Sequence, residues 1–527
     1  MTTRILAPNE REALTRQGCR FAPGCTVKVD AAGEFDTSRI HNVTFAGGVT
    51  LGSEVTLENI GLLSMDPGAS CGYGAKVDVL DETGSLDVPL YPGLTAVAAR
   101  AFVSLRDRIP SSLWEPECCR AAASDRYGMT VGVGATVRNC GELRNVAVGA
   151  GAVVEGACAL CEGVIGDGSR IGAGVIASVF MTGPGAVITD GCIVEHSFVG
   201  EGCTLSGGFT SRHSLIFDNS MLDGGESEAL FAGPHTVSMH KSTLLIGVMT
   251  SFFNAGSGTN FSNHRYKAGP KHFGVCCRGV KMGSDSYIMW PARVGAYSVV
   301  MGRHYKPFDS LRLPYSYITA DTEGSSVIPG AALKSVGFMR DISKWPSRDK
   351  RTLKANPVSY DPFPASAVGA AMDGLELLKA GRNLRGLHLA DHHRRSGIDV
   401  YTTLIDHVMS GVVAEINVPV IEDIRPVMLD FGGTECTLDD VECALAAAGK
   451  GSPERFMAVF TETLAAEASR NSLALLLPRW DKASIGLSAG ELAALHDEAG
   501  AKMHAWWEKD AASEAPFLRQ AAGFLAI

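Results

Sequence analysis

The sequence predicts a mainly β protein, built on a parallel β-helix with an inserted helical segment and a helical C-terminal domain. Three observations predict it. A glycine-containing motif recurs every 17 residues from Val131 onward, residues 95–127 lack the motif and show helical spacing, and Ala-Leu-Glu-rich segments with helical spacing follow residue 365. At 527 residues, 46% of them hydrophobic and 20% charged, the chain is long enough for two or three domains.

The repeat consists of an aliphatic residue, two glycines separated by one residue, and a second aliphatic residue. It reads VGVGATV at Val131, VGAGAVV at Val148, IGDGSRI at Ile165, TGPGAVI at Thr182 and VGEGCTL at Val199. A coiled chain must turn corners, and glycine adopts the positive φ angles that the corners need. The aliphatic residues are expected to point inward and to stack on their equivalents in the next coil.

The pattern divides the chain into five parts. Residues 1–94 are expected to form degenerate coils, residues 95–127 a helical insertion, and residues 128–345 the β-helix with a polar loop region rich in His and Lys. A Pro-rich linker at 346–364 precedes a helical C-terminal domain at 365–527. We expect these last helices to cover the open end of the β-helix.

Composition and charge exclude several classes of protein. The net charge of −10 argues against nucleic-acid binding, which normally needs a basic surface. No stretch approaches the roughly 20 apolar residues of a membrane span. The N-terminus lacks the apolar core of a secretory signal, so we expect a cytoplasmic location and no membrane partner.

Basic residues and histidines concentrate in one region of the β-helix. Between Lys241 and Lys306 there are nine basic residues and a single acid, Asp285. A concentrated positive field attracts anions, so this cluster predicts a site for an anionic small molecule, although any one lysine is more simply explained as a solvated surface residue. The nine basic residues are Lys241, Arg265, Lys267, Lys271, Arg278, Lys281, Arg293, Arg303 and Lys306.

A long polar segment, FFNAGSGTNFSNHRYKAGPKHFG, lies inside this region and is expected to project from the β-helix as a loop. Candidate substrate-binding residues in and around it are Lys241, Asn254, Asn260, Asn263, Arg265, Lys267, Arg303 and His304. His240, His264 and His272 are candidate catalytic residues, since imidazole titrates near neutral pH. For each histidine alone, a packed structural role is at least as well supported.

The glycine motifs resemble those of the hexapeptide-repeat proteins, and that resemblance implies a left-handed β-helix. The chain as a whole resembles an uncharacterised bacterial family of large hexapeptide-repeat proteins, sometimes labelled as related to sugar-nucleotide (UDP-N-acetylglucosamine) pyrophosphorylases. The resemblance is closest in FAGPHTVSMHKSTLL, NAGSGTNFSNHRYKAGPKH and SDSYIMWPARVGAYSVVMGRH. It covers most of residues 1–355, and the catalytic nucleotidyl domain of the pyrophosphorylases is missing.

The resemblance offers two chemistries. In hexapeptide acyltransferases a histidine deprotonates the acceptor, which implies a transferase acting on an anionic small metabolite, most plausibly acyl transfer from acyl-CoA to a sugar or sugar nucleotide, with His240 or His264 as the base. In the related carbonic anhydrases three histidines bind a zinc-type metal, which implies a metal-dependent hydrolase or lyase using His240, His264 and His272. The third alternative is a non-catalytic scaffold or binding protein. A homo-oligomer, possibly a trimer, is expected because such β-helices build sites between subunits.

Overall fold

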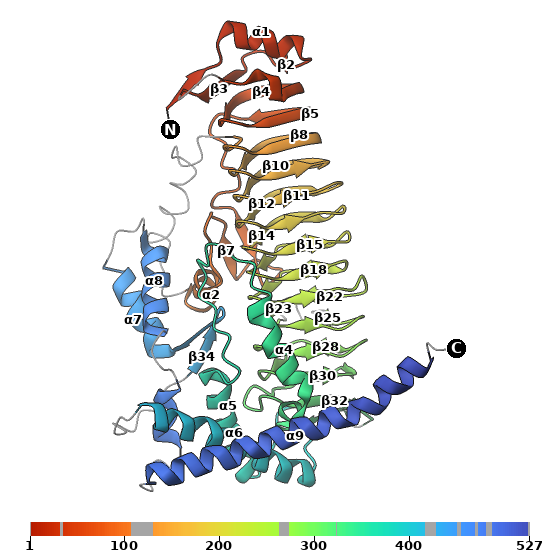
Figure 1. Ribbon diagram of the computed structural model, residues 1–527, viewed down its shortest axis with the longest axis vertical. Coiled ribbons are helices and arrows are strands. Elements are labelled where there is room, and N and C mark those ends of the chain that lie inside the picture. Colours follow the sequence, from red (N-terminus) through yellow and green to blue (C-terminus); the bar gives the residue numbers. More distant parts are fainter. Residues whose placement is uncertain are drawn as a thin grey trace.

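The structure is a computed structural model that describes residues 2–31, 35–106, 130–262, 273–322, 324–416, 428–450, 455–468, 473–480 and 487–524. Its main feature is a tall stack of short parallel strands, with helices from both the insertion and the C-terminal part along one side and at one end (Figure 1). The predicted parallel β-helix is therefore confirmed. The left-handed sense of winding, which only the resemblance implied, stays a prediction.

The 17-residue step of the repeat is the length of one coil. Val131 bridges Val148, and Ala159 pairs with Ile176, which in turn pairs with Ile193. The short strands of each coil pair with those of the coils above and below. The strands of this regular part are β8 (Thr136–Val148), β9 (Val153–Glu155), β10 (Ala159–Ile165), β11 (Arg170–Ile171), β12 (Ile176–Thr182), β13 (Val187–Ile188), β14 (Ile193–Val199), β15 (Thr204–Ser206), β16 (Thr210–Arg212) and β17 (Leu215–Ile216).

The coils continue past the last clean repeat, with steps of similar length. Thr210 pairs with Glu226, and Glu226 pairs with Leu244. The later strands are β18 (Met221–Asp223), β19 (Glu226–Glu228), β20 (Phe231–Ala232), β21 (Val237–Ser238), β22 (Leu244–Ile246), β23 (Val248–Thr250), β24 (Asn254–Ala255), β25 (Asn260–Ser262), β26 (Gly274–Cys276), β27 (Lys281–Met282), β28 (Tyr287–Met289), β29 (Arg293–Val294), β30 (Val299–Met301), β31 (Arg303–His304), β32 (Tyr317–Asp321) and β33 (Gly324–Ile328).

The N-terminal coils stop earlier than the sequence predicted. They comprise β1 (Thr3–Ile5), β2 (Arg20–Phe21), β3 (Thr26–Asp30), β4 (Ile40–Leu51) and β5 (Thr56–Met65). Since Thr56 of β5 pairs with Thr136 of β8, the chain between β5 and β8 is inserted between two adjacent coils. The insertion therefore begins after Met65 rather than at 95. It contains the hairpin β6 (Lys76–Asp78) and β7 (Asp87–Pro89) and the predicted helix, α2 (Ala96–Ser104), whereas 107–129 lie outside the described residues.

The two glycines of each repeat serve different purposes, and only one of them turns a corner. The second glycine, such as Gly151 with φ +63°, has the left-handed backbone that we expected. The first, such as Gly149, has an ordinary φ, but a Cβ atom there would lie 2.6 Å from the backbone nitrogen of Asp167 in the next coil. Our expectation that both glycines form corners was wrong for the first, which instead allows neighbouring coils to approach closely.

Beyond Gly202 the same corner is occupied by larger residues that keep a positive φ. They are Asn219, His235, Phe252, Tyr297 and Tyr315, with one glycine, Gly279, among them. The aromatic residues among them form an outer aromatic ladder, in which His235 stacks on Phe252 and the Tyr297 and Tyr315 rings stack at 5.0 Å. The glycine signal disappears there because α4 (Val336–Ser347) packs on this ladder, with Trp345 at 4.7 Å from Phe252.

The segment predicted as a linker, 346–364, is tied to the solenoid. Glu201 accepts hydrogen bonds from the backbone N–H groups of Thr352, Leu353 and Lys354, at 2.5, 2.5 and 3.0 Å. Arg351 is buried and pairs with Asp218 of the solenoid at 3.3 Å. This segment therefore runs back along the coils as a fixed strap.

A second hydrophobic core lies outside the coils, on one face of the solenoid. Residues that point outward from successive coils on this face are apolar and pair in register: Ala147, Val164, Met181, Phe198, Leu215, Phe231, Met249 and Val275. We call this row the outer column. It is covered by α2 and by the hairpin β34 (Met428–Phe431) and β35 (Thr434–Thr437), together with α7 (Leu438–Ala448) and α8 (Phe456–Ala468).

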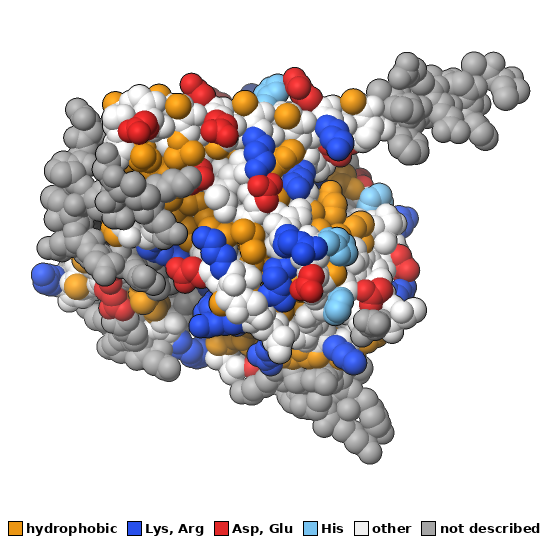
Figure 2. All heavy atoms as spheres, turned by 90° about the horizontal axis from the view of Figure 1, so that it is seen from below, with side chains coloured by type: hydrophobic (Ala, Val, Ile, Leu, Met, Phe, Trp, Pro, Cys, Tyr) orange, Lys and Arg blue, Asp and Glu red, His pale blue; other side chains and the backbone are white. Residues whose placement is uncertain are grey.

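Helices close both ends of the stack (Figure 1). At the N-terminal end, α1 (Pro8–Arg16) buries Leu14 in the core. At the other end lie α5 (Ala365–Lys379), α6 (Asp391–Ile416) and α9 (Ala489–Phe524), and Tyr401 of α6 donates a hydrogen bond to the carbonyl of Pro314 at 2.7 Å. This end of the molecule carries Lys and Arg side chains interspersed with acids and hydrophobic residues (Figure 2). The helical C-terminal part is thus confirmed, with the β34–β35 hairpin as an unpredicted addition.

Candidate functional site: an arginine-lined pocket

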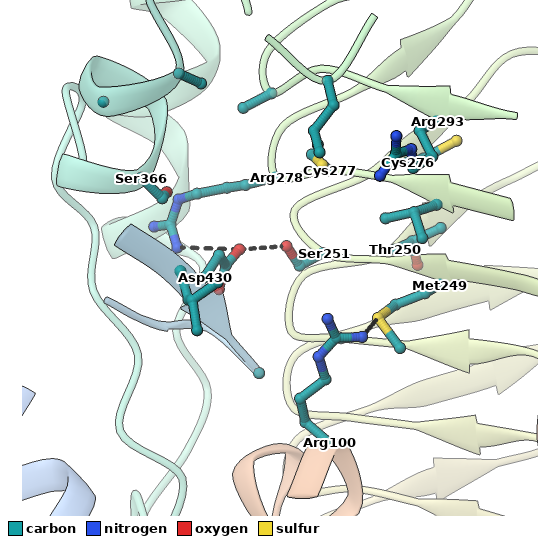
Figure 3. Close-up of a pocket in the computed structure, with 18 of the residues that line it drawn as sticks. Arg100, Met249, Thr250, Ser251, Cys276, Cys277, Arg278, Arg293, Ser366 and Asp430 are labelled. Carbon is teal, nitrogen blue, oxygen red and sulfur yellow. Dashed lines mark hydrogen bonds and ion pairs between the residues drawn. The ribbon is translucent and has the colours of Figure 1, made fainter. Parts of the chain in front are cut away.

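A cavity of about 660 Å³ opens where the cover of the outer column is incomplete. It lies between the solenoid strands β23 and β26, helix α2, strand β34 and the N-terminal half of α5 (Figure 3). A volume of this size is typical of sites for small organic ligands.

The floor of the pocket follows from the register of the coils. Phe231, Met249, Val275 and Arg293 are paired in that order along one face, so three apolar residues of the outer column are followed by an arginine in the next coil. Arg293 in turn bridges Asp309 and forms an ion pair with it. The floor therefore changes from apolar to charged within one coil.

Five arginines from five different segments line the pocket: Arg100, Arg278, Arg293, Arg312 and Arg479. Three of them face an acid: Arg293 pairs with Asp309, Arg479 pairs with Asp373, and Arg278 lies 4.0 Å from Asp430. Arg293 and Arg312 are exposed, whereas Arg278 is buried. The lining contains two carboxylates, Asp373 and Asp430, so positive charge predominates.

Arg278 is held rigidly with one side of its guanidinium left open. It is 1% exposed, its Nε donates to the Tyr297 hydroxyl at 3.0 Å, and its Nη2 donates to the Ser359 carbonyl. The guanidinium also stacks on the Phe252 ring at 3.8 Å. Burial lowers the pKa of Arg278, but Tyr297, Asp430 and Glu435 outweigh burial and the pKa is raised. Its Nη1 lies 4.0 Å from Asp430 and, although buried, has no hydrogen-bond partner among the described residues.

Arg100 of α2 is the least satisfied charge in the pocket. Its Nη1 donates to the thioether sulfur of Met249, which is a weak acceptor, and its buried Nε has no partner among the described residues. Burial lowers the pKa of Arg100, and the charges of Asp430 and Cys277 offset that effect only in part. A cation in this environment is stabilised when an anion enters the pocket.

Two carboxylates stand beside the arginines. Asp430 accepts hydrogen bonds from the Ser251 hydroxyl and from the Gly433 N–H, both at 2.8 Å (Figure 3). Glu435 lies behind it and accepts from the N–H and hydroxyl of Ser366, at 2.8 and 3.0 Å. Burial, reinforced by the charge of Asp430, raises the pKa of Glu435 to about 7. Glu435 is therefore able to hold or release a proton near neutral pH.

The site residues predicted from the sequence lie elsewhere or outside the described residues. His240 and Lys241 are exposed in the turn between β21 and β22, Asn254 is exposed on β24, and Asn260 is half-buried on β25. Arg303 is exposed and pairs with Asp285. These residues belong to the other two faces of the solenoid or to its edges, and none of them lines the pocket.

His304 is buried, and its contacts are with residues of the solenoid itself. Its Nδ1 lies 2.8 Å from the Ser325 hydroxyl, and burial lowers its pKa to about 4. Asn263, His264, Arg265, Lys267 and His272 fall within 263–272, outside the described residues. Asn260 pairs with Tyr287, so the coil that contains this segment is longer than its neighbours.

The metal-site hypothesis is tested only in part. Within the described ranges, no group of three His, Cys, Asp or Glu residues is placed to hold a metal ion. Of the three expected zinc ligands, His240 alone belongs to those ranges.

The sequence contained two signals for the pocket, of which we used one. Arg278 and Arg293 belong to the basic cluster that predicted an anion site. The unused signal is the outer column, in which Val164, Met181, Phe198 and Leu215 recur at the coil period at positions that point outward. Apolar residues at outward positions of a solenoid indicate a covered face.

The fold and the pocket together define a class of protein, a parallel β-solenoid with an arginine-lined cavity between the coils and the elements that cover them. Among the helices in the described part of the chain, none has the length and apolar character needed to cross a bilayer. Residues 50–382 match the model of DUF4954, a domain of unknown function, and the chain belongs to this family. No curated protein matches it. The matched segment includes Arg100, Arg278 and Arg312 and ends before Asp430.

Proposed function

We propose that this protein binds an anionic small metabolite in the arginine-lined pocket and that it is a transferase acting on that metabolite. The observation that carries the proposal is the guanidinium of Arg100, which faces the pocket with a thioether as its one hydrogen-bond acceptor among the described residues. A desolvated charge without an anionic partner is destabilising by several kcal/mol in general. Charges of this kind are found at functional sites, where a bound ligand supplies the opposite charge.

The neighbouring arginines support the same proposal. Arg278 Nη1 lies 4.0 Å from Asp430 and has no hydrogen-bond partner among the described residues, and no ion pair joins Arg312 to a described carboxylate. Arginine is well suited to anions because its planar N–H groups match the oxygens of a carboxylate or phosphate. The resemblance to hexapeptide-repeat acyltransferases supports a transferase rather than a simple binding protein.

For the reaction we propose acyl transfer from a thioester to a hydroxyl group of the bound anion, with a carboxylate rather than a histidine as the base. Asp430 accepts a hydrogen bond from the Ser251 hydroxyl, so its position suits an O–H donor. The acceptor hydroxyl would give its proton to Asp430 while its oxygen forms the new ester bond, and the thiolate would leave and take up a proton.

The test compares thermal unfolding with and without anions for wild type, Arg100→Met and Arg170→Gln. Inorganic phosphate, acetate, octanoate and acetyl-CoA serve as probes. Arg170 is an exposed arginine on β11, away from the pocket, and provides the matched control. At least one probe should raise the melting temperature of wild type and of Arg170→Gln but not that of Arg100→Met.

In buffer without these anions, Arg100→Met should be more stable than wild type, by about 1 kcal/mol, because it replaces a half-buried charge, whose buried Nε has no partner among the described residues, with an apolar side chain. The variant Arg100→Gln keeps a hydrogen-bond donor but removes the charge. It provides a second test of anion binding if the methionine variant fails to fold. Equal responses of wild type and both Arg100 variants to every probe would refute anion binding at this pocket.

A further inference from the structure

We infer that the anion bound in the pocket carries an apolar, carbon-rich body, as in an aliphatic carboxylate, and that the body packs on the outer column. This inference rests on the anion binding proposed above and names its ligand class. Its basis is the combination, in one pocket, of an apolar floor with buried guanidinium nitrogens of Arg100 and Arg278 that have no hydrogen-bond partner among the described residues.

The floor of the pocket is the part of the outer column that α2 and the β34–β35 hairpin leave uncovered. In the coils that precede the pocket, the apolar residues of the outer column are buried by α2 and by the β34–β35 hairpin with α7 and α8. At the pocket, Val275 is half-buried and lines the cavity together with Phe231 and Met249. Leu311 and Ala296 from the solenoid side, and Ala370 and Leu429 from the opposite side, add further apolar surface. Apolar surface left open in this way favours a ligand that buries it.

The hydroxyl groups that line the pocket already have partners. The Ser251 hydroxyl donates to Asp430 (Figure 3). The Thr250 hydroxyl bonds the Thr236 hydroxyl at 2.9 Å, and the Ser366 hydroxyl donates to Glu435. A polyhydroxylated body would have to displace these bonds or leave its own hydroxyls unpaired, and either outcome costs affinity. Among the described pocket residues, Arg100 and Arg278 have buried N–H groups without hydrogen-bond partners, and these guanidinium groups would bind the anionic end.

Arg278 supplies independent support for a ligand at this place. It is a polar side chain with 1% exposure that lines the cavity, and its buried Nη1 has no hydrogen-bond partner among the described residues, with Asp430 4.0 Å away. Its other nitrogens are fixed by Tyr297 and Ser359, and its plane is fixed by Phe252. Nη1 is therefore held in place beside Asp430 in the lining of the cavity, which lowers the entropy lost on binding.

Calorimetric titration with octanoate, acetate and ribose 5-phosphate tests the inference. Octanoate has an anion and an apolar body, acetate has the anion alone, and ribose 5-phosphate has an anion on a polar body. Octanoate should bind wild type at least about tenfold more tightly than acetate or ribose 5-phosphate, because burial of each methylene adds to the affinity. Arg100→Met should lose octanoate binding, while Arg170→Gln should retain it.

The variant Val275→Thr distinguishes the contribution of the apolar body to the affinity from that of the anionic group. Threonine has nearly the shape of valine and suits a strand, but it adds a hydroxyl to the floor. It should weaken octanoate severalfold and leave the affinity for acetate unchanged. Tighter binding of ribose 5-phosphate than of octanoate, lost in Arg100→Met, would overturn the inference and leave the proposed function standing. Absence of binding by every anion in wild type would overturn both.

Discussion

His235 stands at a corner of the solenoid where the backbone φ is +58° and where the side chain is 4% exposed. Its Nε2 lies 2.9 Å from the Tyr360 hydroxyl, and its ring stacks on Phe252. Burial, with the charge of Arg351 as a second cause, lowers the pKa of His235 to about 3. The folded protein therefore keeps this imidazole neutral through a pH range in which the unfolded chain protonates it.

The sign of the pH effect follows from this difference. Between the unfolded pKa near 6.5 and the folded pKa near 3, the unfolded state binds one more proton at His235 than the folded state does. His235 therefore lowers the free energy of unfolding as pH falls through this window, by at most about 1.4 kcal/mol per pH unit. His304, whose pKa burial lowers to about 4, acts in the same direction.

We predict that His235→Asn flattens this dependence. Asparagine tolerates a positive φ, and Asn219 already occupies the same corner one coil earlier. Urea unfolding at pH 4.5, 5.5 and 7 should show wild type losing more stability on acidification than the variant. Parallel pH profiles for the two proteins would contradict the assigned titration.

At the scale of the coil, the two glycines of the motif make different demands on the chain. Gly151 needs the left-handed conformation, but a Cβ there would meet nothing within 4 Å. Gly149 has no such backbone requirement, but a Cβ there would collide with the backbone of the next coil. The close-approach glycine therefore determines how tightly two coils stack, whereas the corner glycine determines the path of one.

We predict that Gly149→Ala destabilises the protein more than Gly151→Ala does. Alanine at the open left-handed corner costs about 1 to 2 kcal/mol. Alanine at Gly149 must push two coils apart and weaken the hydrogen bonds between them, so its cost should be larger. Chemical denaturation of the two variants beside wild type measures both values, and an equal or reversed order would contradict the separate roles.

The same coils show how far the sequence could predict the fold. The clean repeats were predictable because their glycines and inward aliphatic residues recur at a fixed step. In later coils the step persists, but His235, Phe252 and Tyr297 replace the corner glycine, since α4 and the strap cover them, and the pattern becomes invisible. The insertion boundary was missed because degenerate coils and the β6–β7 hairpin show similar short apolar runs.

At the scale of the whole molecule, the pocket depends on contacts that no local pattern contains. Arg100 comes from the insertion, Arg278 and Arg293 from the solenoid, and Arg479 from the 3-10 helix 474–479 near the C-terminus. The anion site that the basic cluster predicts stays a prediction. Arg278 and Arg293 of that cluster line the pocket, whereas the other lining side chains were not predicted. Their convergence follows from tertiary packing on the outer column.

The outer column leads to a prediction about long-range stability. Phe198 is 3% exposed although it points outward, whereas Ile176, an outward residue on another face, is 43% exposed. Phe198→Ala should cost about 3 to 5 kcal/mol, because it leaves a cavity between the solenoid and its cover. Ile176→Ala should cost about 0.5 kcal/mol or less. Guanidinium unfolding curves provide both values, and similar losses in the two variants would contradict a sealed second core.

The insertion leaves the solenoid beside β5 and runs down its outside, with the Leu80 N–H bonded to the Ala229 carbonyl and Arg100 against Met249. It therefore spans a fixed number of coils. Repetitive arrays readily gain or lose copies in evolution, yet here one added copy would shift Met249 by about 4.8 Å relative to Arg100. The insertion therefore fits only one number of coils. A change in the number of repeats would separate Arg100 from Met249 and disrupt the pocket.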